Sequence, residues 1–156
     1  MKLTGTFHQR VGQMNWAFGN RLYNREDAPW EEYAKRLVKN VLDELIELEK
    51  AIATGSFDGY RDAMCDIQIF TAGEQYRERL DGEDDCKVVL DSLLTRFVKN
   101  PGDLAASIAM HNAKGVFDIS VEGEYPLVVL RSLSDQPDAP KGKFLKSASY
   151  EQPVFK

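Results

Sequence analysis

The chain has 156 residues, of which 43% are hydrophobic and 29% charged, and its formal net charge at pH 7 is −5. This length suits one domain, and the negative charge argues against nucleic acid as the main partner. No stretch reaches the about 20 apolar residues of a membrane span, and residues 1–12 lack the apolar core of a secretory signal. The two cysteines show neither metal-ligand spacing nor a disulfide pattern, which fits a reducing compartment. We therefore expect a cytoplasmic protein that binds neither nucleic acid nor a membrane.

Helical periodicity dominates the first 114 residues. Glycine, proline and capping residues divide this part into five segments. The segments expected to be helical are residues 6–19, 29–54, 56–80, 84–98 and 103–111. Gly55 should end the second helix, and Ser56 or Asp58 should cap the third.

The pattern changes after residue 114. Phe117, Ile119 and Val121 alternate with polar residues, which predicts a strand, and "EGEYP" predicts a turn into a partner strand at residues 127–131. The remaining tail is rich in turn formers and lysine. We expect a mainly α fold, a bundle of four to five helices with a small C-terminal β-hairpin and an extended tail. It should be a single domain, residues 1–156, in which 1–114 form the helical body and 115–156 the hairpin and basic tail.

Three carboxylates cluster on the second predicted helix. Within "VLDELIELEKAI", Asp43, Glu44 and Glu47 lie inside an arc of about 100°. One interpretation is a solvated face with Lys39–Asp43 and Glu47–Lys50 ion pairs.

Two more carboxylates lie on the third predicted helix. Asp62 and Asp66 are one turn apart, on the side that also carries Ile69 and Phe70, so we expect them to face inward. Two like charges there are costly unless a cation or hydrogen-bond donors compensate them. The alternative is a buried aspartate pair tied to basic side chains.

Together the two helices predict a metal site. A turn at Gly55 would bring Glu44 and Glu47 opposite Asp62 and Asp66. Facing carboxylates suit a hard divalent cation, Mg²⁺ or Mn²⁺, and magnesium sites of this kind typically serve phosphate chemistry.

These residues also resemble a known family. "DELIELEKAI" followed by "DAMCDIQIFTAG" is similar to the all-α nucleoside triphosphate pyrophosphohydrolases, the MazG-like group related to phosphoribosyl-ATP pyrophosphohydrolase. Their signature is EExxE followed by ExxD or, in phage-type members, by DxxxD, an apolar run and a glycine. Asp43 stands in place of the first Glu, and the remaining motif positions are matched by Glu44, Glu47, Asp62, Asp66 and Gly73.

Three flanking segments extend the resemblance to a phage-type member. "MNWAFG" looks like the family's "FHxAFG", with Asn15 in place of His. "KGKFLKSASYEQPVF" looks like "GKVLKSPNYxxPDL", and "AMHNAKG" loosely resembles "SNMSK", with Lys114 matched.

The resemblance implies hydrolysis of a nucleoside triphosphate, usually a deoxynucleotide, to the monophosphate and pyrophosphate, with a role in nucleotide-pool control. It implies two or more Mg²⁺ or Mn²⁺ ions, with Asp43 as an additional ligand or a base. The predicted ligands are Glu44, Glu47, Asp62 and Asp66. The predicted substrate contacts are Asn15 and Trp16 for the base and Lys114, Lys143 and Lys146 for the polyphosphate. A homodimer or homotetramer is implied too, and the apolar surplus of the second helix agrees with it.

Several alternatives stay open at this point. One is phosphoribosyl-ATP pyrophosphohydrolase itself. Another is a non-catalytic helical module for oligomerisation or regulation, which the Asp43 replacement favours slightly. Within the family, the sequence leaves the preferred base open, with dGTP and pyrimidine triphosphates as the options.

Overall fold

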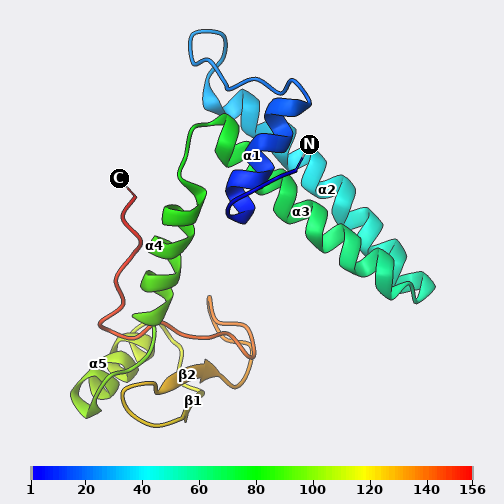
Figure 1. The fold of residues 1–156 in the computed structure, drawn as a ribbon. Coiled ribbons are helices and arrows are strands. Elements are labelled where there is room, and N and C mark those ends of the chain that lie inside the picture. The colour runs from blue at the N-terminus through cyan, green and yellow to red at the C-terminus, as the bar shows by residue number, and fades with distance from the viewer. Residues whose placement is uncertain (1, 156) are drawn as a thin grey trace. The chain divides into compact units, whose positions relative to one another are not determined.

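The computed structural model describes residues 2–155, and the fold is mainly α (Figure 1). Its helices are α1 (Phe7–Ala17), α2 (Trp30–Thr54), α3 (Phe57–Arg77), α4 (Gly82–Leu94) and α5 (Pro101–Asn112). They are followed by an antiparallel hairpin of β1 (Ile119–Glu122) and β2 (Val129–Ser132). The predicted class is therefore confirmed. None of the described helices is long and apolar enough to cross a membrane.

The chain forms two compact units, which we call the N-unit (Met1–Asp85) and the C-unit (Cys86–Lys156). The division falls inside α4, after its first turn. The sequence had suggested a helical body that ends at residue 114. In the structure α5 belongs instead with the hairpin, because its Leu104 and Ile108 pack on the core of the C-unit.

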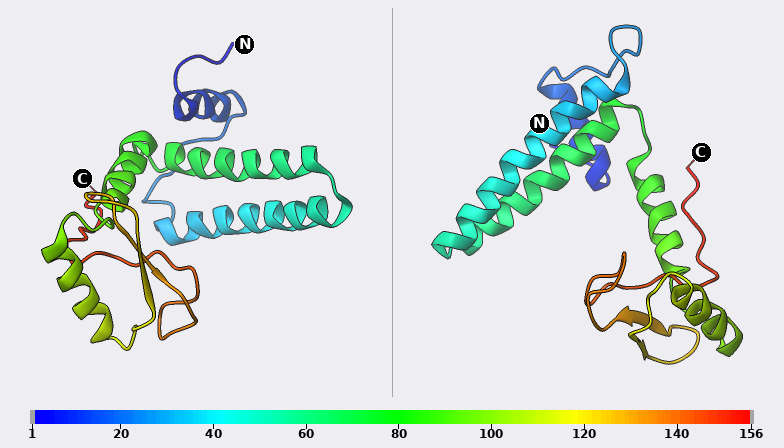
Figure 2. Two further views of the ribbon diagram at one scale, coloured as in Figure 1. Left: turned by 90° about the horizontal axis from the view of Figure 1, so that it is seen from below. Right: turned by 180° about the vertical axis from the view of Figure 1, so that it is seen from behind.

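The centre of the N-unit is the helical hairpin of α2 and α3, which lie side by side (Figure 2). Gly55 ends α2 in the left-handed conformation, with φ of 67°, which glycine adopts without strain. Ser56 then caps α3 by accepting a hydrogen bond from the Gly59 amide. This two-residue connection makes the helices antiparallel, as predicted.

Helix α1 packs on α3. It begins with a capping box, in which Thr6 and Gln9 satisfy each other's backbone amides. Val11, Gly12 and Asn15 are its buried residues.

Helix α2 keeps a large apolar surface uncovered. Leu37, Val41 and Leu48 are half-buried, whereas several apolar neighbours are exposed. The exposed ones are Val38, Leu42, Leu45, Ile46 and Ile52. The surplus expected from the sequence is thus present.

The C-unit holds the one cluster of fully buried apolar side chains that the described residues form. It comprises Val98, Val116, Val128, Leu130, Ala139 and Leu145. The fourth helix was expected to continue to residue 98, but it ends at Leu94. Val98 pairs instead with Val128 as an isolated bridge, because this places its side chain in the core.

The tail is irregular but is not a solvated extension. The Leu145 amide donates to the Leu130 carbonyl at 2.8 Å, and Ser147 Oγ donates to the Thr95 carbonyl at 2.7 Å. Leu145 and Ser147 are both buried. The sequence predicted an extended tail. In the structure, backbone hydrogen bonds and one buried leucine tie this tail to the hairpin.

Candidate functional site

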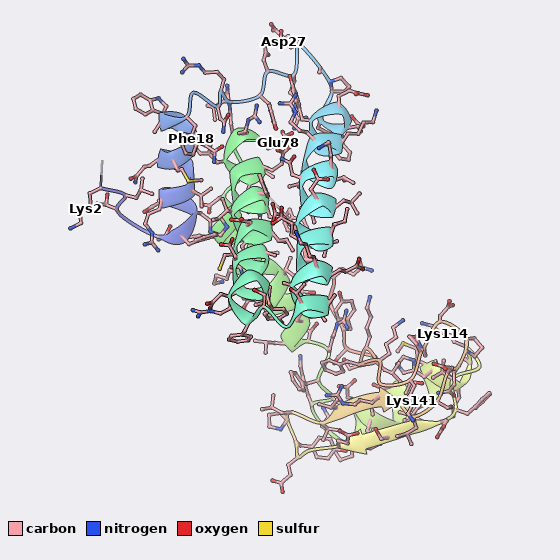
Figure 3. The ribbon with its side chains drawn as sticks, turned by 90° about the vertical axis from the view of Figure 1, so that its right-hand side faces the viewer. Lys2, Phe18, Asp27, Glu78, Lys114 and Lys141 are labelled. Carbon is pink, nitrogen blue, oxygen red and sulfur yellow. The ribbon has the colours of Figure 1, made fainter. Side chains whose placement is uncertain are left out.

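The four predicted ligands lie on the α2–α3 hairpin, two on each helix. Glu44 and Asp66 are half-buried, whereas Glu47 and Asp62 are exposed. Figure 3 shows the side chains that extend from these two helices. Asp62 was expected to face inward; its side chain is exposed, although it lies within electrostatic reach of Glu44 on α2. Apolar residues are spread around α3, and Phe57 and Met64 are exposed, so the apolar pattern did not define one inward side.

Glu44 is the electrostatic centre of this group, which we call the acid cluster (Asp43, Glu44, Glu47, Asp62 and Asp66). Burial raises the pKa of the Glu44 carboxyl, and repulsion from the other four carboxylates raises it further. Its Oε2 atom is buried and has no hydrogen-bond partner. An unpartnered buried carboxylate oxygen is costly, so this position favours a cation or a proton.

Asp43 differs from its neighbours because it is exposed and paired. Lys39 Nζ donates to Asp43 Oδ2 at 2.8 Å, so that predicted ion pair forms. Glu47 and Lys50 do not form the other predicted pair within 4.0 Å. The solvated-face interpretation therefore explains Asp43 but leaves Glu47 without a partner of that kind.

The acid cluster is not a preformed metal cage. Among residues 2–155, no group of three or more His, Cys, Asp or Glu side chains has the arrangement that would hold a metal ion. The predicted ligand set is thus brought to one region, within electrostatic reach of Glu44, without direct convergence of its oxygens.

A cavity of about 350 Å³ lies beside the acid cluster, where α1, α2 and α3 meet. Asn40 lies one turn from Glu44 on α2, and Phe70 lies one turn from Asp66 on α3. We call this space the three-helix cavity. Its lining also includes Asn15, Arg36, Gly73, Glu74 and Arg77.

Asn15, predicted to contact the base, is buried at the edge of this cavity. Its Nδ2 donates to the Val11 carbonyl at 3.0 Å, and its Oδ1 accepts from Asn20 Nδ2 at 2.8 Å. A Cβ atom on Gly73 would approach Asn15 Nδ2 to 3.0 Å. Glycine at position 73 therefore lets the Asn15 amide lie against α3.

Glu74 adds an anchored carboxylate. The Tyr23 hydroxyl donates to its Oε2 at 2.7 Å, while its Oε1 is buried without a partner. Burial, followed by this bond to Glu74, raises the pKa of Tyr23 to about 12, so the hydroxyl stays a donor. The ring of Tyr23 stacks on Tyr33 with centroids 3.8 Å apart, which fixes its position.

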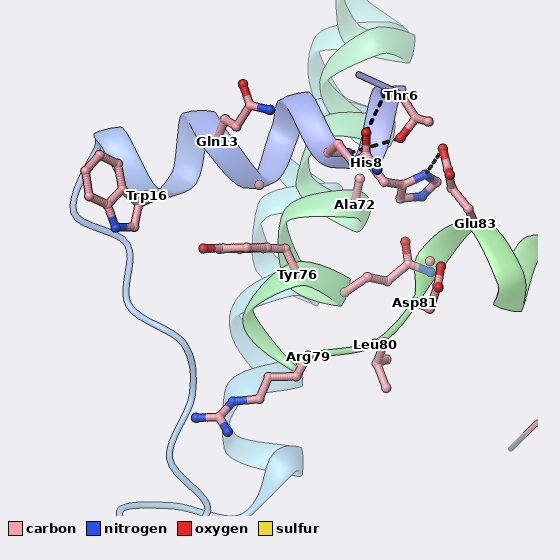
Figure 4. A pocket seen from close by; sticks show the side chains of 14 residues that line it. Thr6, His8, Gln13, Trp16, Ala72, Tyr76, Arg79, Leu80, Asp81 and Glu83 are labelled. Atoms are coloured by element: carbon pink, nitrogen blue, oxygen red, sulfur yellow. Dashed lines mark hydrogen bonds and ion pairs between the residues drawn. The ribbon is translucent and has the colours of Figure 1, made fainter. Parts of the chain in front are cut away.

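Trp16 does not share a cavity with Asn15. It is 67% exposed and lines a larger cavity of about 850 Å³ formed by α1, α3 and the start of α4. Trp16 and Glu83 lie at opposite ends of this space, with Tyr76 between them (Figure 4). None of the acid cluster lines it. The two residues predicted to contact one base therefore face different spaces.

The three predicted polyphosphate contacts, Lys114, Lys143 and Lys146, all belong to the C-unit; Figure 3 labels Lys114. They line one cavity of about 370 Å³. The structure thus brings the three lysines together, and their contact with the substrate stays a prediction.

Several residues of these cavities were not predicted from the sequence. Arg36, Asn40 and Glu44 follow one another at spacings of four, and this repeat on α2 was a usable signal. Arg96, which lines the cavity of the three lysines, lies 18 residues before Lys114 in the chain and had no local signal.

Comparisons with models of protein families, with curated proteins and with solved structures gave no match. The family resemblance therefore depends on the sequence motifs alone.

Proposed function

We propose that this protein is a Mg²⁺- or Mn²⁺-dependent nucleoside triphosphate pyrophosphohydrolase of the all-α, MazG-like type. It would convert a deoxynucleoside triphosphate to the monophosphate and pyrophosphate and so control a nucleotide pool. The observation that supports this most is the acid cluster, in which four carboxylates raise the pKa of Glu44 and one Glu44 oxygen is buried without a partner.

The donor chemistry of the acid cluster fits the proposed ions. All its donors are carboxylate oxygens, which Mg²⁺ and Mn²⁺ prefer. Rotation of the Glu47 and Asp62 side chains is unhindered by burial, since both are exposed. Glu44, Glu47, Asp62 and Asp66 would hold the ions. When bound, the ions would supply neutralisation of the phosphate charge and a water of lowered pKa.

The protein's own residues would bind and orient the substrate. The three-helix cavity begins one helical turn from the acid cluster, so a nucleoside in this cavity would direct its phosphates toward the carboxylates. Asp43 Oδ2 is held by Lys39, which leaves Oδ1 to accept a hydrogen bond from the attacking water. These contacts would align the water with the bond between the α and β phosphates.

The three-helix cavity also bears on the choice of base. Its buried acceptor, Glu74 Oε1, lacks a partner, and the Watson–Crick edge of guanine presents two N–H donors. Glu74 Oε1 could accept one of these donors in a charge-assisted hydrogen bond, while Oε2 keeps its bond from Tyr23. Of the options that the sequence leaves open, dGTP is therefore the one that we propose.

An oligomer is part of the proposal. The exposed apolar residues of α2 exceed what α3 covers, and burying such a surface between copies is favourable. A homodimer or homotetramer would accomplish this.

The first test removes single charges from the acid cluster. Glu47→Gln and Asp66→Asn should each lower kcat/KM on the best dNTP by about 10²-fold or more, because one charged ligand is lost. Glu49→Gln is the matched control, since Glu49 is an exposed acid on the same helix and outside the cluster. Full turnover in either cluster variant would remove the metal assignment.

A second measurement separates the enzyme from its alternatives. Mn²⁺ should raise the melting temperature of the parent chain and not that of Asp66→Asn, whereas a non-catalytic module would show no shift. A substrate panel that includes phosphoribosyl-ATP should show dNTP turnover only.

A further inference from the structure

The cavity of the C-unit has a lining unlike that of the two cavities of the N-unit described above. It measures about 370 Å³ and lies among α5, the segment after it and residues 137–150. Four cationic side chains line it, which are Arg96, Lys114, Lys143 and Lys146, against one carboxylate, Asp138. We call this space the basic cavity.

The charges of the basic cavity are not neutralised within the described residues. None of the four cations has a carboxylate of residues 2–155 within 4.0 Å. Lys143 Nζ donates to the Asp138 backbone carbonyl, and Lys146 Nζ lies 4.1 Å from the centre of the Tyr150 ring. These contacts hold the side chains but leave a net charge near +3 around one space.

One donor of Arg96 is unsatisfied, although its Nη1 donates to the Phe144 carbonyl at 3.5 Å. Its guanidinium lies 5.6 Å from the Tyr150 ring and 5.9 Å from the Phe144 ring. Its Nε is buried without a hydrogen-bond partner. A buried guanidinium donor without an acceptor is costly, so negative charge close to this side chain would be favourable.

The wall of the basic cavity is fixed before any ligand binds. His111 is buried, and its Nε2 lies 2.8 Å from the Lys146 carbonyl oxygen. The Ala148 amide donates to Ser107 Oγ at 2.8 Å, and Ser147 Oγ to the Thr95 carbonyl. Because this backbone is held on both sides of Lys146, little order has to be gained on binding.

The size and charge of the space select the kind of anion. A phosphate monoester carries about −1.5 to −2 at pH 7, so two linked phosphates match a charge near +3 better than one. An extended polyanion such as nucleic acid fits poorly, since the cations surround a hollow and the chain carries −5 overall.

We propose that the basic cavity is a binding site for the diphosphate group of a small molecule, with Arg96, Lys114, Lys143 and Lys146 as its cations. Three of these cations are the lysines that the resemblance predicts to contact the polyphosphate of the substrate, and Arg96 completes a site that lies within the C-unit. Binding of a diphosphate there does not require turnover at the acid cluster. Free pyrophosphate and a nucleoside diphosphate share the required chemistry.

The test is calorimetric titration of the full chain with pyrophosphate in EDTA, where metal binding at the acid cluster cannot contribute. One pyrophosphate should bind per chain, at least tenfold more tightly than inorganic phosphate, and binding should weaken as salt rises. Lys114→Gln and Lys143→Gln should each weaken it about tenfold, the usual effect of one charge-assisted hydrogen bond. Both lysines are exposed, so these variants should fold even if Arg96→Gln does not.

Lys141→Gln is the matched control. Lys141 belongs to the same segment, is exposed and does not line the cavity, and only its backbone amide bonds to Asp135. Equal weakening in this variant, or no binding by the parent, would overturn the proposal. Glu44→Gln should bind normally, which separates this result from the fate of the proposed activity.

The same titration with a nucleoside diphosphate identifies the source of the diphosphate. If the nucleoside diphosphate binds more tightly than pyrophosphate, Phe144 and Tyr150 add stacking on the base. If both bind equally, the phosphates alone are recognised. In both cases, the amide NMR signals that change on binding should be those of residues near Ser147 and Ala148. Changes confined to the N-unit would contradict the assignment.

Discussion

The two units of the chain are built in opposite ways. The N-unit carries 11 Lys and Arg against 17 Asp and Glu, a net −6, and the C-unit 9 against 8, a net +1. The buried apolar cluster lies wholly in the C-unit, while α2 of the N-unit exposes most of its large apolar residues. The C-unit thus completes its own core, whereas the N-unit leaves charges and apolar surface exposed. This difference agrees with metal ions and a second copy at the N-unit.

The largest expected effect comes from truncation. Deleting residues 140–156 removes Leu145 and Ser147 from the core of the C-unit, a loss beyond the about 2–5 kcal/mol of one buried leucine. Hydrogen exchange should show the hairpin unprotected and α2 and α3 still protected. Unchanged hairpin protection would mean that the tail adds nothing to this core.

A pair of leucines compares the units directly. Leu130→Ala should lower the free energy of unfolding by about 2–5 kcal/mol, because Leu130 is fully buried. Leu42→Ala should change it by less than about 0.5 kcal/mol in a dilute monomer, since Leu42 is 54% exposed. Denaturant unfolding measures both. In sedimentation, Leu42→Ala should favour smaller species than the parent chain, and identical profiles would argue against α2 as the contact surface.

A smaller effect is expected at the three-helix cavity. Gly73→Ala places a Cβ 3.0 Å from Asn15 Nδ2 and should cost about 1–3 kcal/mol through overpacking. KM for the dNTP should rise as the Asn15 amide is displaced. In an Asn15→Ala background the cost should largely disappear. A cost that persists there would show that Asn15 is not the group in contact.

The smallest expected effect concerns pH. The pKa of Glu44 is raised in the folded chain, mainly by burial and then by its carboxylate neighbours. Protonation of Glu44 therefore favours folding. This contribution is present below the ordinary pKa of Glu and is lost as pH rises through the higher folded value. In EDTA, the melting temperature of the parent chain should therefore decline as pH rises through the folded pKa of Glu44. Glu44→Gln should show a weaker decline, and Glu49→Gln should show the same decline as the parent.

The sequence was sufficient wherever local chemistry decided the structure. Gly55 was identified as the end of α2, Ser56 was one of two candidate caps of α3, and alternation identified the hairpin. Prediction from the sequence failed where contacts between residues far apart in the chain determine the structure. Val98 lies outside the fourth helix because it pairs with Val128, and the Leu145 amide donates a hydrogen bond to the Leu130 carbonyl. No local sequence pattern indicates either pairing.

The candidate sites show the same limit. The motif predicted that four carboxylates lie in one region, namely Glu44, Glu47, Asp62 and Asp66. The exposure of Asp62, however, depends on how α3 is rotated about its own axis relative to α2. Asn15 and Trp16 are adjacent in the chain yet line different cavities, because successive helical residues point about 100° apart. Arg96 joins the lysines only through the fold of the C-unit.

The products of a single incubation give the sharpest test of the proposed pyrophosphohydrolase activity. The full chain with dGTP and Mg²⁺ should give dGMP and pyrophosphate, and Asp66→Asn under the same conditions should give neither at a comparable rate. Release of dGDP and orthophosphate as first products, or equal turnover by the variant, would contradict the proposed function.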